Sequence, residues 1–141
     1  MVYYAKIVKD SDGYFVEFPE LEGCFSEGDT LEEAKLNAKE ALDGWLASNC
    51  DRKLNIPEPV LRAKRTKFRS FYPIQVDEQI AFSIYLRRSR KEKKFSQKKI
   101  ADLIGVTQQA YAKLETPGKA NPRLSTIAKL KQILNIESYT I

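Results

Sequence analysis

The sequence contains no histidine and only two cysteines, Cys24 and Cys50, among its 141 residues. Without histidine the commonest general base is missing, and two thiols alone argue against a zinc site. Two cysteines are also too few for a disulfide framework, so we expect reduced thiols and a cytosolic protein. No apolar run approaches the roughly 18 residues that a membrane-spanning helix needs, and the first residues lack the layout of a secretory signal. These absences argue against a metalloenzyme and a membrane protein, and we expect no cofactor.

Charges of the two signs are unevenly distributed along the chain. Residues 1–60 hold six Lys and Arg against thirteen Asp and Glu, a balance of −7. Residues 61–141 hold eighteen against six, a balance of +12. This asymmetry predicts two modules with different partners, and the basic module is a candidate for binding nucleic acid. Charge alone does not identify a nucleic-acid-binding module, because many solvated surfaces are basic.

The first module combines alternating β-forming segments with one helical stripe. Thr30 and Glu33 match the T-x-x-E capping box at a helix start, and apolar residues then recur every three or four positions as far as Trp45. The predicted elements are strands 2–9, 14–19 and 24–28, a helix 30–48 and a strand 67–76. This β-β-β-α-β order predicts an α+β domain over residues 1–75, with one helix against one sheet.

Helical patterns replace strands from Asp77 onwards, which places the boundary between the modules near residue 76. The predicted helices cover residues 77–94, 96–105, 107–115 and 124–135. Ser96 and Thr107 suit the N-cap positions of two of them, and Gly105 suits the tight turn between them. This arrangement is typical of a helix-turn-helix, so residues 76–141 are predicted to form an all-α DNA-binding domain.

Gln108 and Gln109 occupy the exposed first turn of the helix that would enter the major groove. A glutamine amide can pair with N7 and N6 of adenine, so the two side chains suit base reading. The alternative is that they are solvated helix residues, because glutamine is a good helix former. The basic run at residues 87–94 has an alternative of the same kind, which is to complement the helix dipole and keep the chain soluble.

Residues 96–135 resemble the helix-turn-helix of the Cro/C1 family of phage repressors. They contain S-Q-x-x-x-A-x-x-x-G-V-T-Q-Q and, later, L-E-x-x-G-K-x-N-P. Ser89 and Tyr111 depart from the family, which has leucine and Ile or Val there, and both departures concern core packing more than DNA contact. The resemblance implies a set of DNA-binding residues around the capping Thr107: phosphate contacts from Gln97, Lys119, Asn121 and Arg123, and base contacts from Gln108, Gln109 and Lys113. Phosphate contacts set register, whereas base contacts carry sequence information.

Residues 12–42 resemble the N-terminal domain of HicB-family antitoxins. They follow the pattern G-Y-x-V-x-F-P-D-L-P-G-C-x-S-x-G-D-T-x-E-E-A closely, with Glu20 and Glu22 in place of the usual Asp and Pro. The resemblance implies a truncated ribonuclease H-like fold. It also implies a HicA-type mRNA-cleaving toxin as partner and repression of the toxin–antitoxin operon. The candidate toxin-binding residues are Phe15, Glu17, Glu20, Glu22, Phe25, Glu27 and Asp29. A solvated role for the acids and a core role for the aromatics are the alternatives.

A nuclease and a ligand-sensing repressor are the two alternatives to an antitoxin. Catalysis of the ribonuclease H kind needs several carboxylates converging on two metal ions. Asp10 and Asp12 lie on a predicted turn, Glu17 lies on a strand and no later Asp cluster completes a site, so we expect no enzyme. A ligand-sensing repressor without a toxin partner stays open as the alternative.

Self-association follows from operator binding. Two half-sites require at least a dimer, formed through the last helix and the tail 135–141 or through the edge of the N-terminal sheet. If both surfaces associate, the assembly is a tetramer.

Overall fold

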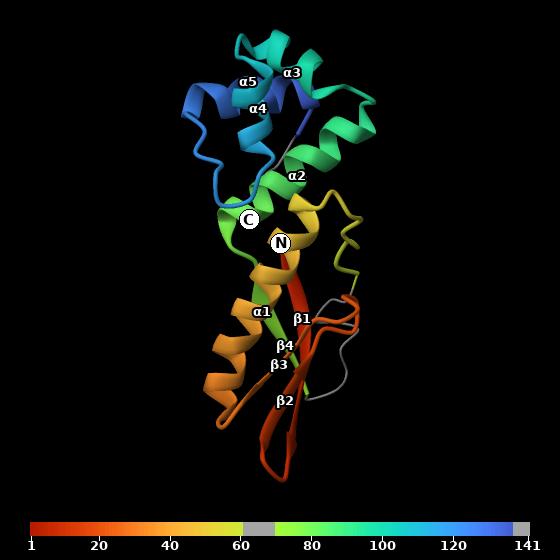
Figure 1. The fold of residues 1–141 in the computed structure, drawn as a ribbon, viewed down its shortest axis with the longest axis vertical. Helices are drawn as coiled ribbons and strands as arrows, with labels where there is room; N and C mark the ends of the chain where they lie inside the picture. The colour runs from red at the N-terminus through yellow and green to blue at the C-terminus, as the bar shows by residue number, and fades with distance from the viewer. Residues whose placement is uncertain (61–69, 137–141) are drawn as a thin grey trace. The chain divides into compact units, whose positions relative to one another are not determined.

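The computed structural model describes residues 1–60 and 70–136. The chain divides into two compact units, an N-terminal unit of Met1–Asp77 and a C-terminal unit that begins at Glu78. The elements, labelled in Figure 1, are β1 (Val2–Asp10), β2 (Gly13–Glu17), β3 (Phe25–Gly28), α1 (Leu31–Asp51), β4 (Phe71–Gln75), α2 (Glu78–Glu92), α3 (Gln97–Ile104), α4 (Gln108–Leu114) and α5 (Leu124–Leu134). The predicted β-β-β-α-β order and the helical second half are therefore confirmed.

Two predicted segments lie partly outside the described residues. They are the beginning of the strand 67–76 and the end of the tail 135–141. In the part of the chain that is described, no helix combines the length and the hydrophobicity that crossing a bilayer requires.

The four strands form one antiparallel sheet in the order β3-β2-β1-β4, and α1 lies against one face of it (Figure 1). Alternation along β1 puts Tyr3, Ala5 and Ile7 on the buried face, because successive side chains of a strand point to opposite sides. Pro73 lies on β4, an edge strand, where its missing N–H costs no ladder hydrogen bond on the outer side.

Helix α1 begins at the predicted cap. The Glu33 N–H donates to Thr30 Oγ1 over 3.1 Å, and the Glu33 carboxylate accepts the N–H of Asp29 over 2.9 Å. The helix continues past Gly44 to Asp51, three residues beyond the predicted end. Its buried residues recur at every fourth position: Ala34, Ala38, Leu42, Leu46 and Cys50. This stripe packs on the sheet and forms the core of the N-terminal unit.

Gly28 allows β3 and α1 to approach closely. A Cβ at this position would lie 2.5 Å from the backbone N of Ala34 and 2.8 Å from its Cα. Because backbone atoms cannot move away cheaply, we expect Gly28→Ala to lower the free energy of unfolding of the N-terminal unit by about 1–3 kcal/mol. Fluorescence of Trp45, the chain's single tryptophan, during denaturant unfolding measures this change.

Gly44→Ala is the matched control for that substitution. A Cβ at Gly44 meets nothing within 4 Å, and the position is helical. Alanine there is expected to stabilise the unit by about 0.5–1 kcal/mol. An unfolding midpoint for Gly28→Ala at or above that of the wild type would contradict the close-approach argument.

The C-terminal unit packs around its own apolar core. The buried members of this core are Leu86, Ile100, Ala101, Ile104, Tyr111, Leu130 and Leu134. Ser96 and Thr107 cap α3 and α4 as predicted, since their side-chain oxygens accept N–H groups three residues later. Gly105 adopts the left-handed conformation, with φ of 75°, that ends α3 and turns the chain into α4. The structure therefore confirms the predicted helix-turn-helix.

Candidate functional sites

The first turn of α4 presents two amides on the surface of the C-terminal unit. Thr107 Oγ1 accepts the N–H of Ala110 over 3.1 Å, which fixes where the helix starts. Gln108 and Gln109 follow directly, and both are exposed. Helix α4 is only seven residues long, and Tyr111 is its buried residue. Leu114, near the other end of the helix, packs partly against the same core. The two glutamines thus stand at the exposed end of a short helix whose other side faces the core.

The other predicted DNA-binding residues divide into two groups. Lys113, Lys119, Asn121 and Arg123 are exposed, and Arg123 takes the N-cap position of α5 without a side-chain capping bond. Gln97 is half-buried instead, and its Nε2 donates to Glu115 Oε2 over 2.9 Å. The DNA contacts assigned to these side chains stay predictions.

Sequence reasoning missed the partner of Gln97. Glu115 is 7% exposed and receives hydrogen bonds from three elements. Arg90 of α2 donates from Nε to Oε1 over 2.5 Å and from Nη2 to Oε2 over 3.1 Å, and the Tyr111 hydroxyl donates to Oε1 over 2.8 Å. We call these four residues, Arg90, Gln97, Tyr111 and Glu115, the Glu115 network. It connects α2, the start of α3 and the end of α4.

The Glu115 network shifts the ionisation of its members. Burial by itself raises the pKa of Glu115, but the hydrogen bonds from Arg90, Gln97 and Tyr111 outweigh it and hold this pKa below the ordinary glutamate value. The hydrogen bond to Glu115 raises the pKa of Arg90, and burial together with the nearby carboxylate raises the pKa of Tyr111. The network therefore contains one carboxylate, one guanidinium and one neutral hydroxyl at neutral pH.

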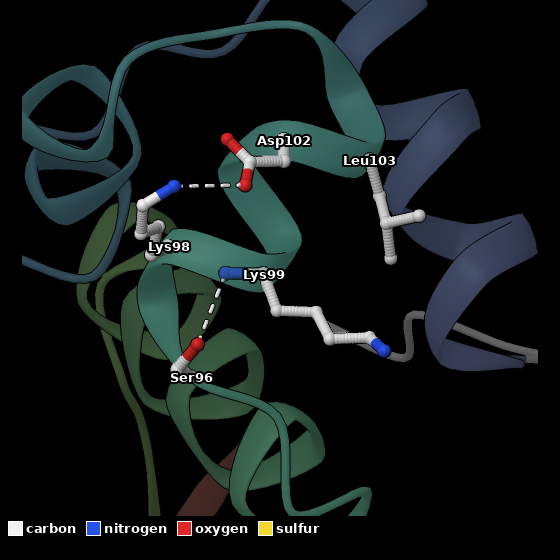
Figure 2. Close-up of a pocket in the computed structure, with 5 residues that line it drawn as sticks. All are labelled: Ser96, Lys98, Lys99, Asp102 and Leu103. Atoms are coloured by element: carbon white, nitrogen blue, oxygen red, sulfur yellow. Dashed lines mark hydrogen bonds and ion pairs between the residues drawn. The ribbon is translucent and has the colours of Figure 1, made fainter.

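A hollow lies on the surface of α3 (Figure 2). It is lined by Ser96, Lys98, Lys99, Asp102 and Leu103. Lys98 Nζ pairs with Asp102 Oδ2 over 3.1 Å, and Lys99 Nζ lies 5.2 Å from the centre of the Phe95 ring. Both lysines thus already have partners within the unit.

The sheet of the N-terminal unit has a second face, opposite α1. Strand alternation puts four of the predicted toxin-binding residues there, namely Phe15 and Glu17 of β2 and Phe25 and Glu27 of β3. The two phenylalanine rings stack with centroids 5.8 Å apart, and the residues are 40% and 56% exposed. Glu17 Oε1 lies 4.0 Å from Lys6 Nζ on β1.

This face, which we call the open face, is more apolar than a solvated sheet surface usually is. Tyr4, Val8 and Phe71 share it with the stacked pair, because each occupies the same parity in its strand register. Val8 is 41% exposed. Antiparallel sheets with one solvated face normally place polar residues there, and the exposed aromatic pair departs from that rule.

Three predicted toxin-binding residues lie in loops instead of on the open face. Glu20 follows β2, and its Oε2 accepts the N–H of Val60 over 2.7 Å, which attaches the loop after α1. Glu22 is exposed, and its carbonyl oxygen accepts Trp45 Nε1–H over 3.1 Å. Asp29 is exposed and precedes the cap of α1. The structure therefore brings together part of the predicted set and separates the rest.

An acidic hollow lies where the β1–β2 hairpin meets the start of α1. Its carboxylates are Asp10, Asp12, Glu27, Asp29 and Glu33. Across residues 1–60 and 70–136, no three His, Cys, Asp or Glu side chains are placed to hold a metal ion. The thiols of this unit are buried as well, and burial raises the pKa of Cys24 to about 11. The hollow contributes negative charge to the surface of the unit.

Two family profiles match the chain. The HicB-like antitoxin of bacterial toxin–antitoxin systems matches residues 3–90, and a helix-turn-helix family matches residues 86–140. A structure described as the HicA3 and HicB3 toxin-antitoxin complex shares 24% identity at a TM-score of 0.48, covering 55% of this chain and 99% of that one.

Similar proteins of known sequence cover shorter stretches. An uncharacterised 14.9 kDa protein from the rep-hol intergenic region of Haemophilus phage HP1 is 60% identical over 42 residues, which are 30% of this chain and 32% of that protein. YonR, a prophage-derived uncharacterised HTH-type transcriptional regulator of Bacillus subtilis, is 42% identical over 57 residues, which are 40% of this chain and 52% of that protein. The chain thus spans between a third and about half of the length of these two relatives.

Proposed function

Because this chain belongs to the HicB-like antitoxins of bacterial toxin–antitoxin systems, we propose that it neutralises a HicA-type toxin and represses its own operon. The N-terminal unit binds the toxin, and the C-terminal unit binds the operator. The observation that carries this proposal is that one chain matches a HicB-like antitoxin over residues 3–90 and a helix-turn-helix family over residues 86–140. The first half of this chain is acidic and the second half is basic.

The open face supports toxin binding by its chemistry. Phe15 and Phe25 form an exposed aromatic pair, and aromatic side chains are the usual anchors of protein interfaces. Glu17 and Glu27 flank the pair, and residues 1–60 have a charge balance of −7. An acidic rim around apolar anchors suits a basic partner, such as a small RNA-cleaving protein, by charge complementarity. We place the toxin on the open face for these reasons.

Coexpression tests the toxin half of the proposal. The full chain would be produced with the product of the adjacent small reading frame and analysed by pull-down and size-exclusion chromatography. We expect a stable complex and relief of growth arrest. If no such partner binds while operator binding persists and responds to a metabolite, a ligand-sensing repressor is the better account.

The surface around α4 supports operator binding. Gln108 and Gln109 stand in the exposed first turn of the second helix of the motif, where base edges are contacted in the major groove. Lys119 and Arg123 are exposed in the loop before α5, where cations can hold phosphates. Two half-sites require at least a dimer, and α5 offers Leu124, which is 85% exposed, for such a contact.

Alanine at Gln108 or Gln109 separates base reading from phosphate binding. We expect either substitution to cost about 1–3 kcal/mol at the operator and to relax its sequence preference, because a bidentate amide contact is lost. Binding titrations on operator and unrelated DNA measure both effects. Arg123→Ala is the comparison variant, and it should weaken binding to all sequences and reduce the salt slope by about one. Unchanged operator affinity after both glutamine substitutions would show that these amides do not contact the bases.

A further inference from the structure

Helix α4 is held against the core of its unit by few side chains. It has seven residues, of which Tyr111 is fully buried and Leu114 packs partly against the same core. Helices of this length have little stability of their own, so tertiary contacts must set their position. The base-reading role proposed for Gln108 and Gln109 needs a helix with a fixed direction, because hydrogen bonds to base edges tolerate only small displacements.

The contacts of Tyr111 fix the direction of α4. Its ring fills the core with 0% exposure, and its hydroxyl donates to Glu115 Oε1 over 2.8 Å. Glu115 is the C-cap of α4, and Arg90 holds the same carboxylate from α2 through two hydrogen bonds. Nη1 of Arg90 also donates to the carbonyl oxygen of Phe95 over 2.8 Å, just before α3. Tyr111 and Glu115 thus attach α4 to both preceding helices.

The same carboxylate also holds the first residue of α3. Gln97 Nε2 donates to Glu115 Oε2 over 2.9 Å. In a helix-turn-helix the starts of the two helices address one half-site, with phosphate contacts near the first and base contacts near the second. A single buried carboxylate therefore fixes the distance between the phosphate-contacting residue proposed at Gln97 and the base-reading turn.

We infer that the Tyr111 hydroxyl is a positioning group for operator recognition, which orients α4 through Glu115 so that Gln108 and Gln109 meet base edges in register. The inference rests on the operator binding proposed above. Tyr111 is too deeply buried to touch DNA itself. Its role is to keep the recognition turn in one orientation before DNA arrives, which avoids the loss of affinity that ordering on binding would cause.

Tyr111→Phe tests the inference, since it removes the hydroxyl and keeps the buried ring. Affinities of the full chain for its operator and for unrelated DNA of equal length would be measured at a temperature where circular dichroism shows both proteins folded. We expect the ratio of operator to unrelated affinity to fall about 3- to 10-fold, as part of the discrimination that the two amides supply is lost. Affinity for unrelated DNA should not change, because it depends on phosphate contacts.

Thr116→Val is the matched control. The Thr116 hydroxyl donates to the Ala112 carbonyl oxygen over 2.9 Å, so this variant also removes one hydroxyl hydrogen bond at the end of α4 but leaves the Glu115 network complete. We expect its affinity ratio to equal that of the wild type. Glu115→Gln, which keeps the shape of the side chain, should lower the ratio at least as much as Tyr111→Phe.

The outcomes separate this inference from the function on which it rests. A wild-type chain that prefers no DNA upstream of its gene would defeat the proposed operator binding, and with it the inference. A selective wild type with an unchanged ratio in folded Tyr111→Phe and Glu115→Gln would overturn the inference alone. Equal losses in Tyr111→Phe and Thr116→Val would also overturn it, since they would indicate a general effect of helix stability.

Discussion

Replacing Glu115 with alanine is expected to lower the free energy of unfolding of the C-terminal unit by about 3–5 kcal/mol, because it leaves a buried charge without its partner. The Arg90 side chain is only 13% exposed and would keep its charge in an apolar surrounding. The Tyr111 hydroxyl and the Gln97 amide would each lose an acceptor as well. Thermal unfolding followed by far-ultraviolet circular dichroism measures the effect, since four of the five described helices belong to this unit.

Asp102→Ala provides the control for Glu115→Ala. Asp102 pairs with Lys98 over 3.1 Å in the same unit, but the two side chains are 66% and 71% exposed. Exposed pairs four residues apart on a helix contribute about 0.3–0.5 kcal/mol, so this variant should unfold almost like the wild type. If the two variants unfolded alike, the Glu115 network would not be the structural anchor that its burial indicates.

The same carboxylate makes the stability of the C-terminal unit depend on pH. Its pKa in the folded unit lies below the ordinary value of 4.5, so folding favours the charged form. This stabilisation is fully present above pH 4.5 and is lost as the pH falls through the lowered folded pKa. Glu115→Gln should flatten the acid limb of the stability profile of this unit. An acid limb as steep as that of the wild type would assign the effect to other carboxylates.

Truncation of the stacked pair on the open face is expected to have the largest effect on toxin binding. Phe15→Ala and Phe25→Ala should each weaken the complex by about 2 kcal/mol, the lower limit for an interface hot spot, or about thirtyfold in Kd. Both residues are already 40% or more exposed in the free protein, so their loss should change its own unfolding little. Calorimetric titration of the purified toxin measures the affinities.

Leu36→Ala is the matched control on the other side of the sheet. Leu36 lies on α1 and is 72% exposed, so it offers an apolar side chain of similar accessibility away from the stacked pair. Its loss should leave toxin affinity unchanged. A larger loss from Leu36→Ala than from either phenylalanine would place the toxin on α1. In every variant, operator binding should remain at the wild-type level.

Local sequence patterns predicted the elements of this fold well. The caps at Thr30, Ser96 and Thr107 and the left-handed Gly105 each depend on residues within four positions, and all four are confirmed. The predicted helix 30–48 includes Gly44, a weak helix former, but ends three residues before the observed end at Asp51. The buried stripe of α1 runs on through Leu46 to Cys50, and this tertiary packing extends the helix beyond what local propensity indicates.

The contacts that build the candidate sites were harder to predict because they join distant residues. Glu115 appears in the sequence as one more polar residue after a short helix, and nothing within four positions indicates that Arg90, 25 residues away, neutralises it. In the sequence, Glu20 likewise resembles the other surface acids. Its partner, the backbone N–H of Val60, lies 40 residues later in the chain. Phe15 and Phe25 lie on one face because of the register between β2 and β3, which the sequence alone did not specify.

Strand β4 closes the N-terminal sheet at Gln75, and every residue of the C-terminal unit is made later. Domains fold as units during synthesis, the N-terminal one first, while the ribosome adds about 5–20 residues per second. The 64 residues of the C-terminal unit, from Glu78 to Ile141, therefore take about 3–13 seconds more to make. The sheet that carries the open face is therefore complete in sequence before the recognition helix has been made. Under the proposed function, a nascent chain would be able to bind the toxin before it could bind the operator.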